Sequence, residues 1–504
     1  MKKILIANRG EIAVRVIRAC REMGISPVAV YSECDRTALH VRLADEAYAV
    51  GPSAPRDSYL RIDRIVDAAK RSGADGVHPG YGFLAENEQF AQAVRDAGLT
   101  FVGPTPEAIA LMGSKTAARS AAKRAGVPLV PGGDGPIAAD ATDAQVHALG
   151  AAVGYPLLVK AVAGGGGKGM RTVGQAADLL GAITAARSEA GSAFGDPAVY
   201  LERRLLRPRH IEVQLLGDAH GTVVPFVERE CSIQRRHQKV VEETPSPAVS
   251  PGLRRAITAA AAAVAKSVGY TNAGTIEFLL DEDGRFYFLE MNTRLQVEHP
   301  ITEAVTGLDL VRWQIRIARG ERVVVDPERL LTPSGHAIEC RVYAEDPDNG
   351  FLPSPGHIVD LRAPAGPGVR DDSGVEAGHD VPIYYDPMIS KLVAWAEDRP
   401  AAVERMRRAL SEYVVSGIKT TLPFFLWLFE QPEFRDAAFH TAYLDEVLAT
   451  RNGTAFAQAA PAVEDVAVMA AAIRSVLSTP PASGASSGTV GKWKAQARSE
   501  GLRD

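Results

Sequence analysis

The chain has 504 residues, of which 46% are hydrophobic and 23% are charged, and its formal net charge is −5. This length exceeds what one hydrophobic core supports, so we expect about three domains. The composition is typical of a soluble globular protein. The acidic balance and the lack of a basic run with interleaved aromatic residues exclude a dedicated nucleic-acid-binding protein.

The opening segment, MKKILIANRGEIAVRVIRAC, predicts no targeting signal. Arg9 and Glu11 interrupt its short apolar run before a signal-peptide core could form, and no segment of the chain is long and apolar enough to span a bilayer. The cysteines are scattered without the paired spacing of a metal site: Cys20, Cys34, Cys231 and Cys340. We therefore expect reduced thiols in a cytoplasmic protein that does not bind a membrane.

The N-terminal region predicts a parallel α/β unit. A strand in KKILIANRG, a helix in EIAVRVIRACREMG and a strand in PVAVYS follow one another, and a second such run ends at TFVGP. The loop NRGE lacks the spaced glycines of a dinucleotide fingerprint, so we do not expect a nicotinamide cofactor here.

A glycine run in VGYPLLVKAVAGGGGKGMRTV lies between two predicted strands. Consecutive glycines let backbone N–H groups approach an anion, and Lys168 adds a charge, although a flexible hinge explains such a run equally well. The run is not a Walker loop, because no Lys-Ser or Lys-Thr pair follows. Lys160 ends the apolar strand before it, and a bound phosphate would be a suitable partner for a lysine at that place.

Polar residues alternate with apolar ones along FLEMNTRLQVEHP: Glu290, Asn292, Arg294, Gln296 and Glu298. In a strand these side chains would share one face, which is either a solvated face or the wall of a site. A two-residue type I′ turn at Asp283-Gly284 would place Glu277 opposite Glu290. Two carboxylates at that distance repel each other, so we expect a divalent cation such as Mg²⁺ between them.

Beyond about Gly335 a further mixed segment runs to about Val447. The stretch EDVAVMAAAIRSVL then predicts one amphipathic helix. The following STPPASGASSGTVG has too few apolar residues to fold and predicts a linker.

The chain contains a set of longer motifs: YPLLVKAVAGGGGKGM, ERECSIQRRHQKVVEE, FLEMNTRLQVEHPITE, IANRGEIAVRVIRA, HPGYGFLAEN, AIECRVYAEDP and YDPMISKLVAW. Together they resemble the biotin carboxylases, a family of ATP-grasp enzymes. The resemblance implies an α/β and α+β multidomain chain: a Rossmann-like domain at 1–114, an ATP-grasp domain at 115–334 with a mobile lid at about 131–204, an α+β C-terminal domain at 335–447, and a tail at 448–504.

The resemblance also implies which residues bind ATP and metal. The expected ATP-binding residues are Lys115, Lys160, Gly166, Gly167, Glu202, Arg203, Arg204, Leu205, His210, Gln234 and His237. For a lone histidine a structural role would be the commoner one, and only the motif context assigns His210 and His237 to the nucleotide. The expected ligands of Mg²⁺ or Mn²⁺ are Glu277, Glu290 and Asn292.

The implied reaction is the carboxylation of biotin with ATP and bicarbonate through carboxyphosphate. Glu298 is the expected base for bicarbonate, and Arg294, the backbone of Val297 and Lys239 are expected to bind it. Arg341 is expected to stabilise the biotin enolate. The sequence alone leaves open an ordinary salt bridge from Arg341 to Glu339, Glu345 or Asp346.

The chain contains no Met-Lys-Met signature of a biotin-accepting lysine. We therefore expect a separate biotin carboxyl carrier protein and a separate carboxyltransferase subunit. The resemblance further implies a homodimer of this chain. Acetyl-CoA carboxylase is the expected holoenzyme; pyruvate, propionyl-CoA and methylcrotonyl-CoA carboxylases remain alternatives. So does an ATP-grasp carboxylate–amine ligase, although such a ligase would not need RLQVEHP, RRHQK and Arg341 together.

Overall fold

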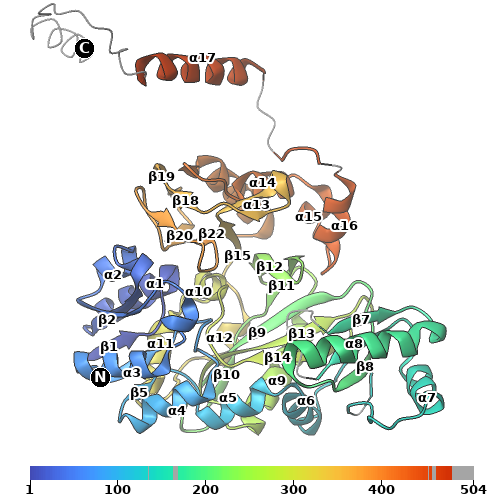
Figure 1. Cartoon of the computed structure of the whole chain (residues 1–504). Coiled ribbons are helices and arrows are strands. Elements are labelled where there is room, and N and C mark those ends of the chain that lie inside the picture. Colours follow the sequence, from blue (N-terminus) through green and yellow to red (C-terminus); the bar gives the residue numbers. More distant parts are fainter. Residues whose placement is uncertain (134, 163–168, 452, 457–460, 479–504) are drawn as a thin grey trace, which may run out of the picture. The chain divides into compact units, whose positions relative to one another are not determined.

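The computed structural model describes the chain except for residues 134, 163–168, 452, 457–460 and 479–504 (Figure 1). The chain divides into two units, Met1–Phe456 and Ala457–Asp504. The predicted linker after the last helix lies outside the described residues. No helix in the described part of the chain has the length and apolar character needed to cross a membrane.

The N-terminal region forms a parallel sheet with the strand order β3-β2-β1-β4-β5, as the strand-helix-strand pattern predicts. Its strands are β1 Lys3–Ile6, β2 Ser26–Ser32, β3 Glu46–Gly51, β4 Gly76–His78 and β5 Thr100–Phe101. Its helices are α1 Gly10–Glu22, α2 Leu39–Leu43, α3 Ile62–Ser72 and α4 Glu88–Asp96, followed by α5 Pro106–Gly113 and α6 Lys115–Arg124.

A smaller antiparallel sheet has the strand order β7-β6-β8. The glycine run follows β6 in the sequence, and its residues 163–168 lie outside the described residues. The elements of this region are α7 Asp143–Val153, β6 Leu157–Ala161, β7 Met170–Val173, α8 Leu179–Phe194 and β8 Val199–Arg203, drawn in green and teal in Figure 1. Apolar side chains of α7 and α8 pack on the sheet, including Val146, Leu179 and Ile183.

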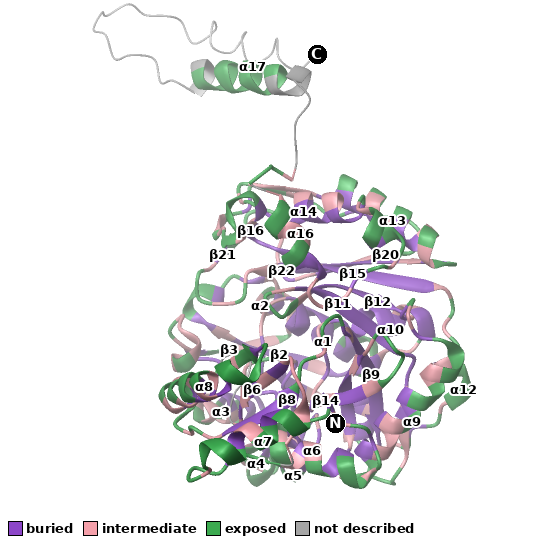
Figure 2. Cartoon of the chain, turned by 90° about the vertical axis from the view of Figure 1, so that its right-hand side faces the viewer, coloured by how far each residue is buried: buried purple, intermediate pink, exposed green. Residues whose placement is uncertain are grey.

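A long antiparallel sheet with the order β14-β13-β9-β11-β12-β15-β22-β20 joins the centre of the chain to its C-terminal part. Its strands are β9 Arg209–Gly217, β11 Arg229–Arg235, β12 Gln238–Thr244, β13 Asn272–Leu280, β14 Phe286–Asn292, β15 His336–Tyr343, β20 Val369–Ser373 and β22 Met388–Ala396, with β10 Val223–Pro225 beside β9. β12 pairs with β15, so residues far apart in the sequence lie side by side (Figure 2).

Alternation along β9 shows how the long sheet positions the site. Ile211, Val213 and Leu215 pack against α9 (Pro251–Ser267), while His210 and Glu212 lie on the opposite face. The polar face of the long sheet, which carries His210 and Glu212, is therefore left for a site.

The remaining helices are α10 His299–Thr306, α11 Leu310–Ala318, α12 Pro327–Leu331, α13 Arg399–Glu412, α14 Leu422–Leu428, α15 Pro432–Arg435 and α16 Tyr443–Thr450.

The second unit contains α17, Pro461–Ser478, where the sequence predicts an amphipathic helix. Val466, Val468, Met469 and Ile473 on this helix are exposed (Figure 2).

Candidate active site

A cavity of about 740 Å³ lies over the polar face of the long sheet and reaches the small sheet. It collects predicted site residues from both sheets and from the loops between their strands: Lys160, Glu202, Arg203, Arg204, Leu205, His210, Gln234, His237, Lys239, Glu277, Glu290, Asn292, Arg294, Val297 and Arg341. Lys115 lines an adjoining cavity of about 480 Å³. Gly166 and Gly167 lie outside the described residues.

The hairpin β13–β14 pairs Glu277 with Glu290, as predicted, but the predicted turn is wrong. The backbone N–H of Asp281 donates to the carbonyl of Arg285, so the loop has a third residue, and Gly284 takes a positive φ of 82°. A bulge at Leu289 adds one residue to β14. The longer loop and the bulge offset each other, so the straight count still finds the right pair.

The bulge also decides which way Glu290 points. Phe286, Phe288 and Met291 all pack in the core, and regular alternation after Phe288 would turn Glu290 to the core as well. Because the bulge absorbs Leu289 as an extra residue, Glu290 faces the cavity instead.

The predicted strand through Glu298 is shorter than expected, because β14 ends at Asn292. Residues 293–298 bend and lead into α10, where Glu298 stands immediately before the first helical residue. Arg294 and Val297 nevertheless line the same cavity as Glu290. The wall of the site is thus half strand and half connecting segment.

Lys239 on β12 is the centre of the charged cluster. Its Nζ donates to Glu212 at 2.5 Å, to Glu277 at 2.8 Å and to Glu298 at 2.8 Å. These carboxylates come from β9, β13 and the segment before α10, so one ammonium group ties together distant parts of the chain. Arg229 shares Glu212 with Lys239, at 2.5 Å.

The surrounding charges set the protonation of these groups. Burial raises the pKa of Glu298, but Lys239 and Arg341 hold that pKa well below its ordinary value. Burial likewise raises the pKa of Glu277, and Lys239 and His210 lower it to a net value below the ordinary one. Desolvation and the Glu277 charge raise the pKa of Glu290. A cation between Glu277 and Glu290 would relieve this repulsion, so the pair fits a divalent metal.

Arg341 lies on β15 and binds two buried carboxylates. Its guanidinium donates to Glu298 Oε2 at 2.9 Å and to Glu242 Oε1 at 2.7 Å. Glu345, one of the partners that the sequence left open, pairs with Arg235 instead. Arg341 and Lys239 therefore bind the two different oxygens of the Glu298 carboxylate.

Arg294 lies in the same cavity wall as Glu290 and Asn292. It donates to Glu86 at 2.8 Å, to the side chain of Gln296 at 2.8 Å and to that of Asn292 at 3.2 Å. Asn292 in turn donates to Glu277 Oε1 at 3.0 Å. Hydrogen bonds thus connect Arg294 to the carboxylate pair.

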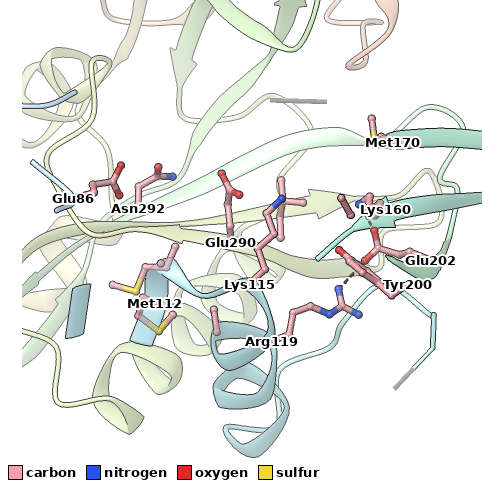
Figure 3. A pocket seen from close by; sticks show the side chains of 15 residues that line it. Glu86, Met112, Lys115, Arg119, Lys160, Met170, Tyr200, Glu202, Glu290 and Asn292 are labelled. Atoms are coloured by element: carbon pink, nitrogen blue, oxygen red, sulfur yellow. Dashed lines mark hydrogen bonds and ion pairs between the residues drawn. The ribbon is translucent and has the colours of Figure 1, made fainter. Parts of the chain in front are cut away.

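The small sheet and α6 supply cations to the far end of the cavity (Figure 3). Lys115, from α6, extends toward Glu290, and burial lowers its pKa in spite of the Glu290 charge. Lys160 contacts the carboxylate of Glu202, which Arg119 binds at 2.7 Å. The Glu202 side chain therefore lies against cations, whereas Arg203 and Arg204 are exposed.

The predicted histidines differ in position. His210 is buried, with Nε2 at 3.0 Å from Glu277 and Nδ1 at 2.9 Å from the amide nitrogen of Gln234. His237 is exposed, in the turn between β11 and β12, where Arg236 and His237 both have positive φ.

A further cavity of about 490 Å³ reaches the same wall from the N-terminal region. Arg294, Val297 and Arg341 line both it and the larger cavity. The two cavities therefore share part of their wall, next to Glu298.

Sequence reasoning missed several charged partners in this cluster. Glu212 could have been found, because His210, Glu212 and Gln214 alternate along β9 in the way that Glu290 and Asn292 do. Glu242 has no such signal, since it sits between apolar and acidic neighbours and meets Arg341 only through the pairing of β12 with β15.

Family models match most of the chain. Residues 1–109 match "Biotin carboxylase, N-terminal domain", residues 114–325 match "Carbamoyl-phosphate synthase L chain, ATP binding domain", and residues 339–446 match "Biotin carboxylase C-terminal domain".

Curated relatives are similar over nearly the same range. A biotin carboxylase of Nostoc sp. is 51% identical over 88% of this chain and 99% of that protein. A pyruvate carboxylase subunit of Methanothermobacter thermautotrophicus is 52% identical over 88% of this chain and 89% of that protein. The alpha subunit of mouse mitochondrial methylcrotonoyl-CoA carboxylase is 48% identical over 88% of this chain and 62% of that protein.

Solved structures show the same fold. The biotin carboxylase of Campylobacter jejuni is 46% identical, with a TM-score of 0.84 over 88% of this chain and 98% of that one. The biotin carboxylase domain dimer of Hydrogenobacter thermophilus 2-oxoglutarate carboxylase, solved with MgADP, ADP and bicarbonate, is 47% identical, with a TM-score of 0.84 over 91% of this chain and 99% of that one. The likeness extends over the whole body that builds the site, and the chain belongs to the biotin carboxylase family.

Proposed function

We propose that this chain carboxylates biotin carried by a separate protein, using ATP and bicarbonate. The observation that carries the proposal is the position of Glu298, which is fully buried directly behind the cavity wall. Its two carboxylate oxygens bind Lys239 and Arg341, which line the cavity together with the Glu277–Glu290 pair. With these roles, a base for bicarbonate and a place for a nucleotide-bound metal would lie in one site.

ATP would lie between the long and the small sheets. Lys115 and Lys160 provide cations for its phosphates, and we assign to the base the strand end and following loop with Glu202, Arg203, Arg204 and Leu205. His210, Gln234 and His237 would face the rest of the nucleotide. Mg²⁺ or Mn²⁺, when bound by Glu277, Glu290 and Asn292, would neutralise phosphate charge.

Bicarbonate would bind against Arg294, the N–H of Val297 and Lys239. Glu298 is ionised in this environment, so it can accept the bicarbonate proton as the oxygen attacks the γ-phosphate of ATP. The products of that step are ADP and carboxyphosphate. Lys239 and Arg294 are already in place to stabilise the charge that develops.

Biotin would enter through the cavity that reaches Arg294, Val297 and Arg341 from the N-terminal region. Carboxyphosphate would release CO₂ and phosphate there, and the phosphate would take the ureido proton of biotin. Arg341 would stabilise the resulting enolate, whose nitrogen attacks CO₂.

We propose that a separate carboxyltransferase passes the carboxyl group on, with acetyl-CoA carboxylase as the first candidate assembly. A pyruvate, propionyl-CoA or methylcrotonyl-CoA carboxylase is the alternative, since relatives of this chain carry several of these names. We further propose a homodimer, because the biotin carboxylase domain of the Hydrogenobacter protein is a dimer. We also propose a location in the cytoplasm, where the scattered cysteines would stay reduced.

The purified chain is expected to cleave ATP only when bicarbonate is present. With ¹⁸O-labelled bicarbonate, one labelled oxygen should appear in the released phosphate, because the attacking oxygen stays on phosphorus when carboxyphosphate breaks down. Mass spectrometry of the phosphate measures this transfer. ATP cleavage that requires an amine, with no labelled phosphate, would support a carboxylate–amine ligase instead.

A further inference from the structure

Lys391 on β22 is fully buried and reaches the wall of the site from the C-terminal part of the long sheet. Its Nζ donates to the backbone carbonyl of Val297 at 3.0 Å and lies 3.1 Å from Glu11 Oε2, on α1. The ammonium group also lies 5.7 Å from the centre of the Tyr81 ring. One side chain therefore joins the N-terminal region, the segment before α10 and the C-terminal strand.

The pairing of strands explains why Lys391 reaches this place. Arg341 and Lys391 are direct cross-strand partners on β15 and β22, so their side chains leave the same face of the sheet. Arg341 binds the carboxylate of Glu298, and Lys391 binds the carbonyl of Val297, the residue before it. Two neighbouring cations thus hold one short segment by its side chain and by its backbone.

This arrangement is costly for the folded protein. Lys391 lies directly opposite Arg341, whose like charge repels it, and directly opposite Asp372 of β20 on its other side, whose charge attracts it. Burial raises the pKa of Glu11 to about 7 in spite of the Lys391 charge beside it. In many proteins, replacing a buried ion pair by an apolar pair of similar volume leaves the stability of the fold unchanged or raises it. The contact that an apolar pair could not supply is the hydrogen bond to Val297.

We propose that Lys391 is a positioning residue for bicarbonate: by binding the carbonyl of Val297, it fixes the N–H of Val297 and the carboxylate of Glu298 in the geometry that activates the substrate. The inference rests on the proposed roles of Val297 and Glu298. Lys391 itself would touch no substrate. It acts through the backbone of the segment that does.

The test compares Lys391→Met with the double variant Glu11→Gln/Lys391→Met. The single variant leaves Glu11 buried beside an apolar side chain, so it should unfold at a lower temperature, and the double variant should recover part of that loss. Both lack the hydrogen bond to Val297. Both should therefore show a bicarbonate KM raised about tenfold to a hundredfold, with the ATP KM nearly unchanged.

Arg399→Met is the matched control. Arg399 also forms an ion pair with a buried carboxylate of the long sheet, at 2.7 Å from Glu243, and its other hydrogen bonds go to the carbonyls of Phe434 and Arg435, away from the residues assigned to bicarbonate. The variant should lower the melting temperature and leave the bicarbonate KM unchanged. This separates loss of a paired cation from loss of the Val297 contact.

Steady-state phosphate release at varied bicarbonate and varied ATP measures both constants. A normal bicarbonate KM in the double variant would overturn the proposal. Any raised bicarbonate KM in the single variant would then come from the unpaired carboxylate of Glu11 and not from the lost hydrogen bond to Val297. An equal rise of both KM values, or a change in melting temperature alone, would overturn it too. The comparison requires that the wild-type chain cleaves ATP in response to bicarbonate, so failure of the proposed function would be seen first, in the wild type.

Discussion

Glu298→Gln is expected to lower bicarbonate-dependent phosphate release about 10²–10⁴-fold, the usual cost of losing a positioned base. Glutamine keeps the shape of the side chain but cannot accept the bicarbonate proton. Carboxybiotin formation should fall by the same factor, because this step precedes carboxyphosphate. Phosphate release and carboxybiotin are measured in the same reaction.

The affinity of the Glu298→Gln variant for ATP should stay close to that of the wild type. Lys239 keeps its contacts with Glu212 and Glu277, so the nucleotide side of the cluster retains its charges. Titration with a non-hydrolysable ATP analogue provides this control. Wild-type turnover in the variant would remove Glu298 from the mechanism even though the family assignment would stand.

Arg341→Ala is expected to lower carboxybiotin formation about 10²–10³-fold, as for the loss of one group that stabilises developing charge. Phosphate release should fall less, so the yield of carboxybiotin per phosphate drops. The ATP KM should change little, because Arg341 binds Glu242 and Glu298 and is not among the cations assigned to the phosphates. Separate assays of the two products measure this ratio.

The same variant should also change the pH profile. Arg341 is one of the cations that lower the pKa of Glu298, so its removal raises that pKa toward the ordinary value. The acid limb of phosphate release should therefore move to higher pH, since the base is ionised only above its pKa. Unchanged carboxybiotin yield with a raised ATP KM would contradict the role assigned to Arg341.

The sequence predicted local features of the site well and its long-range contacts poorly. The alternation around Glu290 and the strand that carries Lys160 are patterns within a few residues, and the resemblance to the family rested on such patterns. Glu242 and Lys391 escaped because each meets the site only through strand pairing across the long sheet. The predicted two-residue turn at Asp283-Gly284 was wrong, because an Asp-Gly pair also suits a three-residue loop in which the glycine adopts the left-handed conformation.

The hairpin has two positions where one residue could be lost without turning the site residues to the other face: the loop at its tip and the bulge at Leu289. Losing Leu289 would restore plain alternation, so Glu290 would still face the cavity and Met291 the core. Losing Met291 would instead bring Asn292, which binds Glu277, to a core position. Single-residue length differences between this hairpin and those of related chains should therefore fall at 282–284 or at 289, and be absent from the rest of the two strands.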